Sequence, residues 1–119
     1  MKPQELGAFG EKLAVKLLID KKHTIIEQNY RQGRGEIDII SMDKATLVIT
    51  EVKTRNSEAL GAPYNSVSRK KQAQLIKLTN MYVKQHSINE EIRFDIISIV
   101  HNQYRTNIEH IEHAFYPIA

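Results

Sequence analysis

Four charged residues on two short apolar segments are the part of this sequence best suited to chemistry. Glu36 and Asp38 stand two positions apart, as do Glu51 and Lys53. Because side chains on a strand alternate between faces, each pair shares one face of its strand. The polar interruption at residues 41–46 has a length that joins antiparallel strands, which indicates a β-hairpin.

The pairing of this hairpin decides how close the charges come. If Met42 pairs with Ala45, Glu36 lies opposite Glu51, and Asp38 lies diagonally from Glu51, roughly 7–8 Å away between Cα atoms. All four charges then project from one face, and a register slip of two residues keeps that parity. Carboxylates gathered away from water need a cation. Because the ligands are hard oxygens, Mg²⁺ or Mn²⁺ is the expected ion.

Two other interpretations of these residues stay open. Zinc fits less well, because the chain has no cysteine and its only close histidine pair, His110 and His113, is expected on a strand that places them on opposite faces. A surface hairpin with ion pairs from Lys53 to Glu36 or Glu51 would need no metal.

The segment from about residue 6 to residue 20 is an expected amphipathic helix that could position a further acid. Lys12, Lys16 and Asp20 form its solvent stripe, whereas Glu11 falls on the apolar side. One interpretation places Glu11 at the edge of the apolar side, where its carboxylate reaches water or interacts favourably with the helix N-terminus. The alternative is that Glu11 is a third carboxylate directed at the metal.

Cations surround these elements in the sequence. An edge strand and a glycine loop are expected up to residue 35, and a second helix is expected at residues 67–86. Cations in the first turns of that helix oppose its dipole, which indicates an external anion, although solvated basic turns are the alternative. Residues 56–63 are expected to form a substrate-contacting loop. The candidate phosphate contacts are Arg31, Arg34, Arg55, Arg69, Lys70 and Lys71.

Composition sets the frame for these elements. The chain has 119 residues, 41% of them hydrophobic, which indicates a single domain over residues 1–119. We expect a cytoplasmic protein and no membrane partner, because no apolar run has the length of a membrane span and no signal-peptide core is present. The net charge of +3 and the pI of about 9.2 suit a polyanionic partner.

With two further strands expected at residues 92–100 and 107–115, the chain predicts an α/β fold: a three-layer core with a mixed β-sheet flanked by helices. This arrangement resembles the restriction-endonuclease-like PD-(D/E)XK superfamily. The sequence resembles more closely the YraN-type family of bacterial proteins, which are similar to archaeal Holliday junction resolvases. The motifs that carry this resemblance are Gly10-Glu11, Asn29-Tyr30-Arg31, Gly35-Glu36-Ile37-Asp38, Glu51-Val52-Lys53-Thr54-Arg55, Lys70-Lys71-Gln72, Arg93-Phe94-Asp95 and Ala114-Phe115.

The resemblance implies a role for each candidate residue. Asp38 and Glu51 would bind the metal with the backbone carbonyl of Val52, and Glu11 would add a direct or water-mediated contact. Lys53 would serve the attacking water. The role of Glu36 stays open between metal ligand, partner of the lysine and structural acid, and Gln72 would have an orienting role.

The function expected from the residues and the resemblance together is a Mg²⁺- or Mn²⁺-dependent endonuclease that hydrolyses DNA phosphodiester bonds, with branched or structured DNA such as Holliday junctions as its substrate. Symmetric cleavage of a junction would require a homodimer with two sites. The alternative is a non-catalytic nucleic-acid-binding or interaction module that retains the nuclease fold.

Overall fold

The computed structural model describes residues 1–57 and 67–117. The expected order of helix, strand, hairpin, helix and two strands is confirmed, whereas most of the predicted loop at residues 56–63 lies outside the described residues. The elements are α1 (Pro3–Asp20), β1 (Thr24–Gln32), β2 (Gly35–Asp43), β3 (Thr46–Arg55), α2 (Arg69–Gln85), β4 (Glu91–His101) and β5 (Thr106–Phe115).

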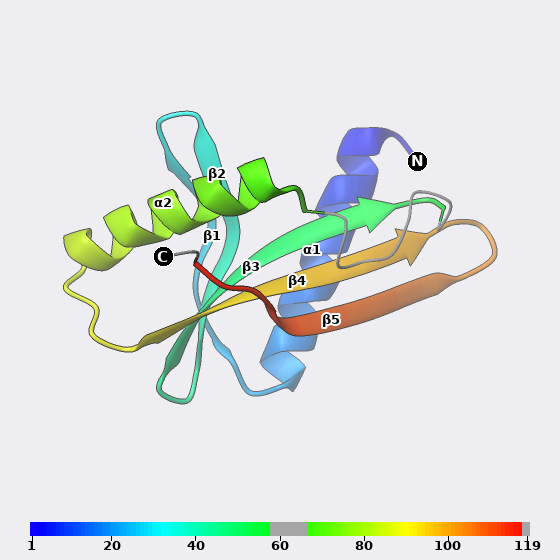
Figure 1. Ribbon diagram of the computed structural model, residues 1–119. Coiled ribbons are helices and arrows are strands. Elements are labelled where there is room, and N and C mark those ends of the chain that lie inside the picture. The colour runs from blue at the N-terminus through cyan, green and yellow to red at the C-terminus, as the bar shows by residue number, and fades with distance from the viewer. Residues whose placement is uncertain (58–66, 118–119) are drawn as a thin grey trace.

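One 5-stranded sheet in the order β1-β2-β3-β4-β5 forms the middle layer. β3 and β4 run parallel, because the chain crosses over through α2 between them, and the other neighbouring strands are antiparallel. α1 lies against one face of the sheet and α2 against the other (Figure 1). The expected three-layer α/β fold with a mixed sheet is therefore confirmed. Within the described ranges, neither helix is long and apolar enough to cross a membrane.

Each helix packs a separate apolar cluster against its face of the sheet. The spacing of Ala14 and Leu18 places both on the buried side of α1, and Leu75, Leu78 and Tyr82 do the same on α2. The cluster under α1 also contains Ile39, Ile97 and Ile99, and the larger cluster under α2 also contains Ile37, Ile40, Leu47, Ile49, Phe94 and Ile96.

The register of the β2–β3 hairpin differs by two residues from the one in which Met42 pairs with Ala45. Met42 pairs with Leu47, and the hairpin closes with Asp43 opposite Thr46. Asp43 remains in the strand, where its carboxylate accepts a hydrogen bond from Arg93 Nη1 at 3.1 Å, so the tight turn begins one residue later than expected.

This register changes which acids meet. The β2–β3 pairs run as far as Ile39 with Thr50, and continuing the same register brings Asp38, rather than Glu36, level with Glu51. Glu51 pairs with Lys71 of α2, whereas Asp38 and Glu36 gather with Glu11 of α1. Because this shift is two residues, it keeps the strand parity, and Asp38 and Glu51 still meet through a side-chain hydrogen bond.

A buried polar network connects β4 with β5 and with the end of the β2–β3 hairpin. Asp95 is fully buried and accepts two hydrogen bonds from Arg93, both of 2.9 Å. His110 Nε2 lies 2.7 Å from the same carboxylate, and the backbone amide of His113 donates to it at 3.2 Å. Burial alone would raise the pKa of Asp95, but the hydrogen bonds from His110 and Arg93 outweigh it and hold that pKa below its usual value. His110 and His113 both lie on β5, in the strand expected for them.

Candidate metal centre

Gly10 allows α1 to approach the sheet closely, and this approach positions Glu11. A Cβ atom at Gly10 would collide with the side chain of Thr54 on β3, so only glycine permits this close approach. Gly10 is buried, and Glu11 beside it is half-buried. The acid on the apolar side of the helix therefore points at the sheet rather than at open water.

Three carboxylates converge where β2 and β3 part. Glu11, Glu36 and Asp38 each offer an oxygen, and these oxygens lie within 4.8 Å of one another. All three residues are half-buried. Such an oxygen-only set, partly withdrawn from water, has the chemistry that a hard divalent cation prefers.

Asn29 of β1 joins two of these acids. With its amide nitrogen turned toward the carboxylates, it donates to Glu36 Oε1 at 2.7 Å and to Glu11 Oε1 at 3.1 Å. Asn29 adopts a left-handed backbone conformation, φ 54°, which asparagine tolerates better than most residues. This residue belonged to the recognised Asn29-Tyr30-Arg31 motif, but its role in the cluster was missed.

Asp38 lies at the centre of the cluster. Its Oδ2 accepts a hydrogen bond of 2.8 Å from the backbone amide of Val52. Burial, a hydrogen bond with the Glu51 side chain and the charge of that side chain raise the pKa of Asp38 to about 8, although the Val52 amide opposes the shift. Without a cation, Asp38 therefore holds a proton at neutral pH.

The outer acids respond to the same crowding. Burial and the charge of Asp38 raise the pKa of Glu11, while the Asn29 hydrogen bond partly opposes this. Glu51 is 9% exposed and lies 3.6 Å from Lys71 Nζ on α2. Arg31 lies 3.5 Å from Glu36, but its side chain is 75% exposed, so this pair contributes little.

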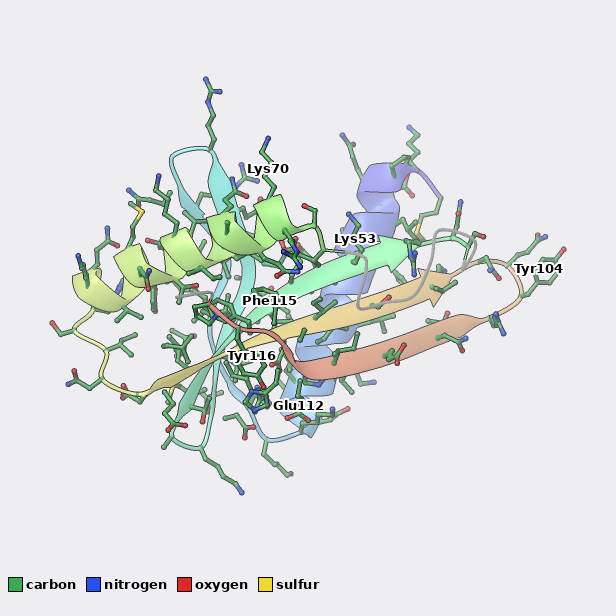
Figure 2. The ribbon with its side chains drawn as sticks, in the orientation of Figure 1. Lys53, Lys70, Tyr104, Glu112, Phe115 and Tyr116 are labelled. Carbon is green, nitrogen blue, oxygen red and sulfur yellow. The ribbon has the colours of Figure 1, made fainter. Side chains whose placement is uncertain are left out.

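Lys53 is exposed on β3, and among the described residues no hydrogen bond or ion pair joins it to the carboxylates (Figure 2). Gln72 does not reach them either, because its Nε2 donates to the backbone carbonyl of Val67 at 3.1 Å. The structure thus brings Glu11, Glu36 and Asp38 into one cluster, with Glu51 against its inner side.

The candidate phosphate contacts differ in accessibility. Arg55 is 9% exposed, which makes it a part of the protein interior rather than an open contact. Lys71 is committed to the acid on β3. Arg34, Arg69 and Lys70 are exposed, and Lys70 points away from the sheet at the first turn of α2 (Figure 2).

Together these features define a small three-layer α/β protein with an acidic cluster at the point where two central strands part. A sequence profile of the uncharacterised protein family UPF0102 matches residues 10–99, and the chain belongs to this family. The expected YraN-type resemblance is thereby confirmed.

The relatives cover nearly the whole chain. A UPF0102 protein of Christiangramia forsetii is 46% identical over 112 residues, which is 94% of each chain. One from Flavobacterium psychrophilum is 44% identical over the same length and coverage. One from Phocaeicola vulgatus is 40% identical over 113 residues, 95% of this chain and 93% of the relative.

Proposed function

We propose that this protein is a Mg²⁺- or Mn²⁺-dependent endonuclease that hydrolyses DNA phosphodiester bonds and belongs to the PD-(D/E)XK superfamily. The observation that carries the proposal is the convergence of Glu11, Glu36 and Asp38, with the pKa of Asp38 raised to about 8. A divalent cation at this cluster would offset the burial and the neighbouring charge that raise the pKa values of Asp38 and Glu11.

Asp38 and Glu51 would hold the ion with the backbone carbonyl of Val52, and Glu11 would contact it directly or through water. A bound divalent ion lowers the pKa of coordinated water and neutralises charge on a phosphodiester. Asn29 keeps the carboxylates of Glu11 and Glu36 oriented, so the cluster needs little rearrangement before binding.

Lys53 would serve the attacking water or the charge that develops on the phosphate. Its ammonium is exposed and is not neutralised by the acidic cluster among the described residues, so it is available to an incoming phosphate. Gln72 would enter only if substrate released its amide from the carbonyl of Val67.

Branched DNA is the proposed substrate shape and the cytoplasm the proposed compartment. Exposed Arg34, Arg69 and Lys70 would contact the phosphate backbone. Cleavage of both strands of a symmetric junction would require a homodimer that presents two sites.

The test is cleavage of linear duplex, flap, four-way junction and single-stranded DNA with Mg²⁺ or Mn²⁺. Wild type should cut at least one substrate, and Asp38→Asn or Lys53→Ala should lower the rate by on the order of 10²–10³-fold. Lys12→Ala, which removes an exposed lysine from α1, is the matched control and should cut normally. Intact DNA binding with no cleavage of any substrate would favour the non-catalytic module instead.

A further inference from the structure

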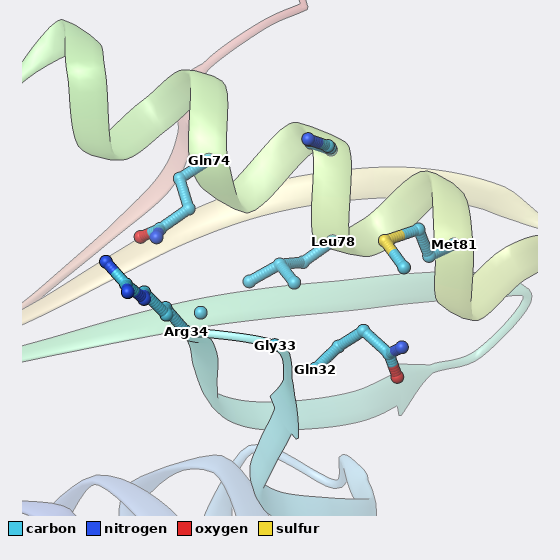
Figure 3. A pocket seen from close by; sticks show the side chains of 8 residues that line it. Gln32, Gly33, Arg34, Gln74, Leu78 and Met81 are labelled. Carbon is cyan, nitrogen blue, oxygen red and sulfur yellow. The ribbon is translucent and has the colours of Figure 1, made fainter.

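A notch between α2 and the β1–β2 turn is separate from the carboxylate cluster. It has a volume of about 340 Å³, near the lower end of the range for small-ligand pockets. Gln74, Leu78 and Met81 point from α2 toward the turn that carries Gln32 and Arg34 (Figure 3).

Two glycines shape this notch. Gly33 at the tip of the turn has φ 61°, which permits the tight reversal. A Cβ atom at Gly35 would collide with the Leu78 side chain, so glycine lets the start of β2 approach α2 closely. The floor of the notch is thus held against the buried core rather than formed by a loose loop.

The notch is lined partly by apolar side chains and partly by polar and basic ones. Leu78 and Met81 offer an apolar surface, and the amides of Gln32 and Gln74 offer hydrogen-bond donors and acceptors beside it. Arg34 and Lys77 add positive charge, and among the described residues no acid lines the notch. A flat heteroaromatic ring with polar edges and a nearby anion, which is a nucleotide, matches this combination.

The notch continues toward the candidate metal centre. A second hollow of about 270 Å³ is lined by Ser68, Lys70, Lys71 and Gln74, so Gln74 borders both. Lys71 lies 3.6 Å from Glu51, which joins this second hollow to the acids.

The lining residues of α2 follow one face of the helix. Lys70, Gln74, Lys77 and Met81 recur at helical spacing. The whole of α2 carries no acidic residue, and its cations are Arg69, Lys70, Lys71, Lys77 and Lys84. A helix of this charge attracts a polyanion along its length.

We propose that one unpaired DNA strand lies along this face of α2 and places a nucleobase in the notch formed by Gln32, Gln74, Leu78 and Met81. Arg34, Lys70 and Lys77 contact the flanking phosphates. The inference rests on the proposed function, because it takes the carboxylate cluster as the site of cleavage. It adds that the substrate presents an unpaired nucleotide close to that cluster. Gly35 and Asp38 are three residues apart on β2, or about 10 Å along an extended strand.

The first experiment measures binding without metal, so that cleavage cannot interfere. The probes are a short fluorescent single-stranded thymidine oligonucleotide and a blunt duplex of equal length, titrated in chelator at several salt concentrations. Gln74→Ala should weaken single-strand binding about 3- to 10-fold without changing its salt dependence, and should leave duplex binding unchanged. Lys77→Gln should lower the slope of log K against log salt by about 0.7. Lys16→Gln on α1, which lies on the other face of the sheet, is the matched control for charge.

The second experiment uses the unmodified protein and so does not depend on a variant that folds. A single-stranded oligonucleotide carrying one 5-iodouracil should crosslink to the segment of α2 that contains Gln74 and Met81. Crosslinks confined to α1 or β5, or equal losses of single-strand and duplex binding in Gln74→Ala, would overturn the inference.

Failure of the strand path and failure of the nuclease proposal would give different results in these experiments. Single-strand binding through the notch without cleavage by any metal-loaded sample would reject the nuclease and keep the strand path. Cleavage that persists while Gln74→Ala binds single strands normally would reject the strand path and keep the nuclease.

Discussion

At the scale of single residues, Asn29 holds the acids of the candidate centre in place. It reaches Glu11 on α1 and Glu36 on β2 from a third element, β1. A side-chain amide can donate both its protons without adding charge, so it orders two carboxylates that would otherwise repel each other.

Replacing Asn29 by glycine should weaken Mn²⁺ binding about 10- to 100-fold, as is typical when a residue that orients metal ligands is removed. Glycine keeps the left-handed backbone but removes both donors, and the pKa of Glu11 should rise further because its hydrogen bond is lost. Calorimetric titration with Mn²⁺ at neutral pH measures the effect. Gln28→Ala, at the exposed neighbouring position, is the control, and equal affinity in Asn29→Gly and wild type would contradict this role.

Strand alternation was enough to single out Glu36, Asp38 and Glu51 in the sequence. It could not show the contribution of Asn29, because a strand residue is expected to be extended and Asn29 is not. Nothing in the sequence indicated that the amide of Gln72 donates to the backbone carbonyl of Val67, since that contact depends on the local path of the chain before α2.

At the scale of elements, the contact of α1 with β3 depends on Gly10, which has a hydrogen atom where alanine would have a methyl group. Gly10→Ala should destabilise the protein by about 1–3 kcal/mol, because the added Cβ meets Thr54. Gly7→Ala in the same helix is the matched control. Its Cβ meets nothing within 4 Å, so this change should stabilise by about 0.5–1 kcal/mol.

Urea unfolding of both variants measures the difference. Gly10→Ala should cost less in a Thr54→Ala background, because two of the three atoms that its Cβ meets are then absent. Equal stability of Gly10→Ala and Gly7→Ala would show that α1 can move away from the sheet at no cost.

The order and type of all elements were predictable, because apolar residues recur in each at helix or strand spacing and polar segments separate one element from the next. The hairpin register was not, because it depends on Asp43 remaining in β2 to accept from Arg93, a residue fifty positions later. That distant contact carries no signal in the local turn sequence.

At the scale of the whole molecule, the pKa values of two aspartates of the sheet, half-buried Asp38 on β2 and buried Asp95 on β4, shift in opposite directions. The pKa of Asp38 is raised to about 8, so between about pH 4 and pH 8 the folded state holds a proton that the unfolded chain has released. Its contribution to stability is present at the acidic end of this window and is lost as pH rises. Asp95 has a lowered pKa, so its contribution is present above about pH 4 and is lost as pH falls further.

In metal-free buffer, the free energy of unfolding should therefore decline as pH rises from about 5 to 8. Asp38→Asn cannot ionise and should flatten this decline, while the loss of stability in acid remains because Asp95 is unchanged. Urea titrations from about pH 2 to about pH 8 measure both limbs. A decline of the same slope in Asp38→Asn would assign the alkaline limb to other groups.

The bond from the Val52 backbone amide to the Asp38 carboxylate also gives the protein an internal spectroscopic reporter. In an ordinary sheet this amide would donate to a strand carbonyl and would register only the opening of the fold. Here its magnetic resonance frequency should follow the state of one carboxylate, whether protonated or ionised, and would change again if the proposed metal binds there. Binding of the proposed metal would therefore be visible at a single backbone amide, with no chemical probe attached.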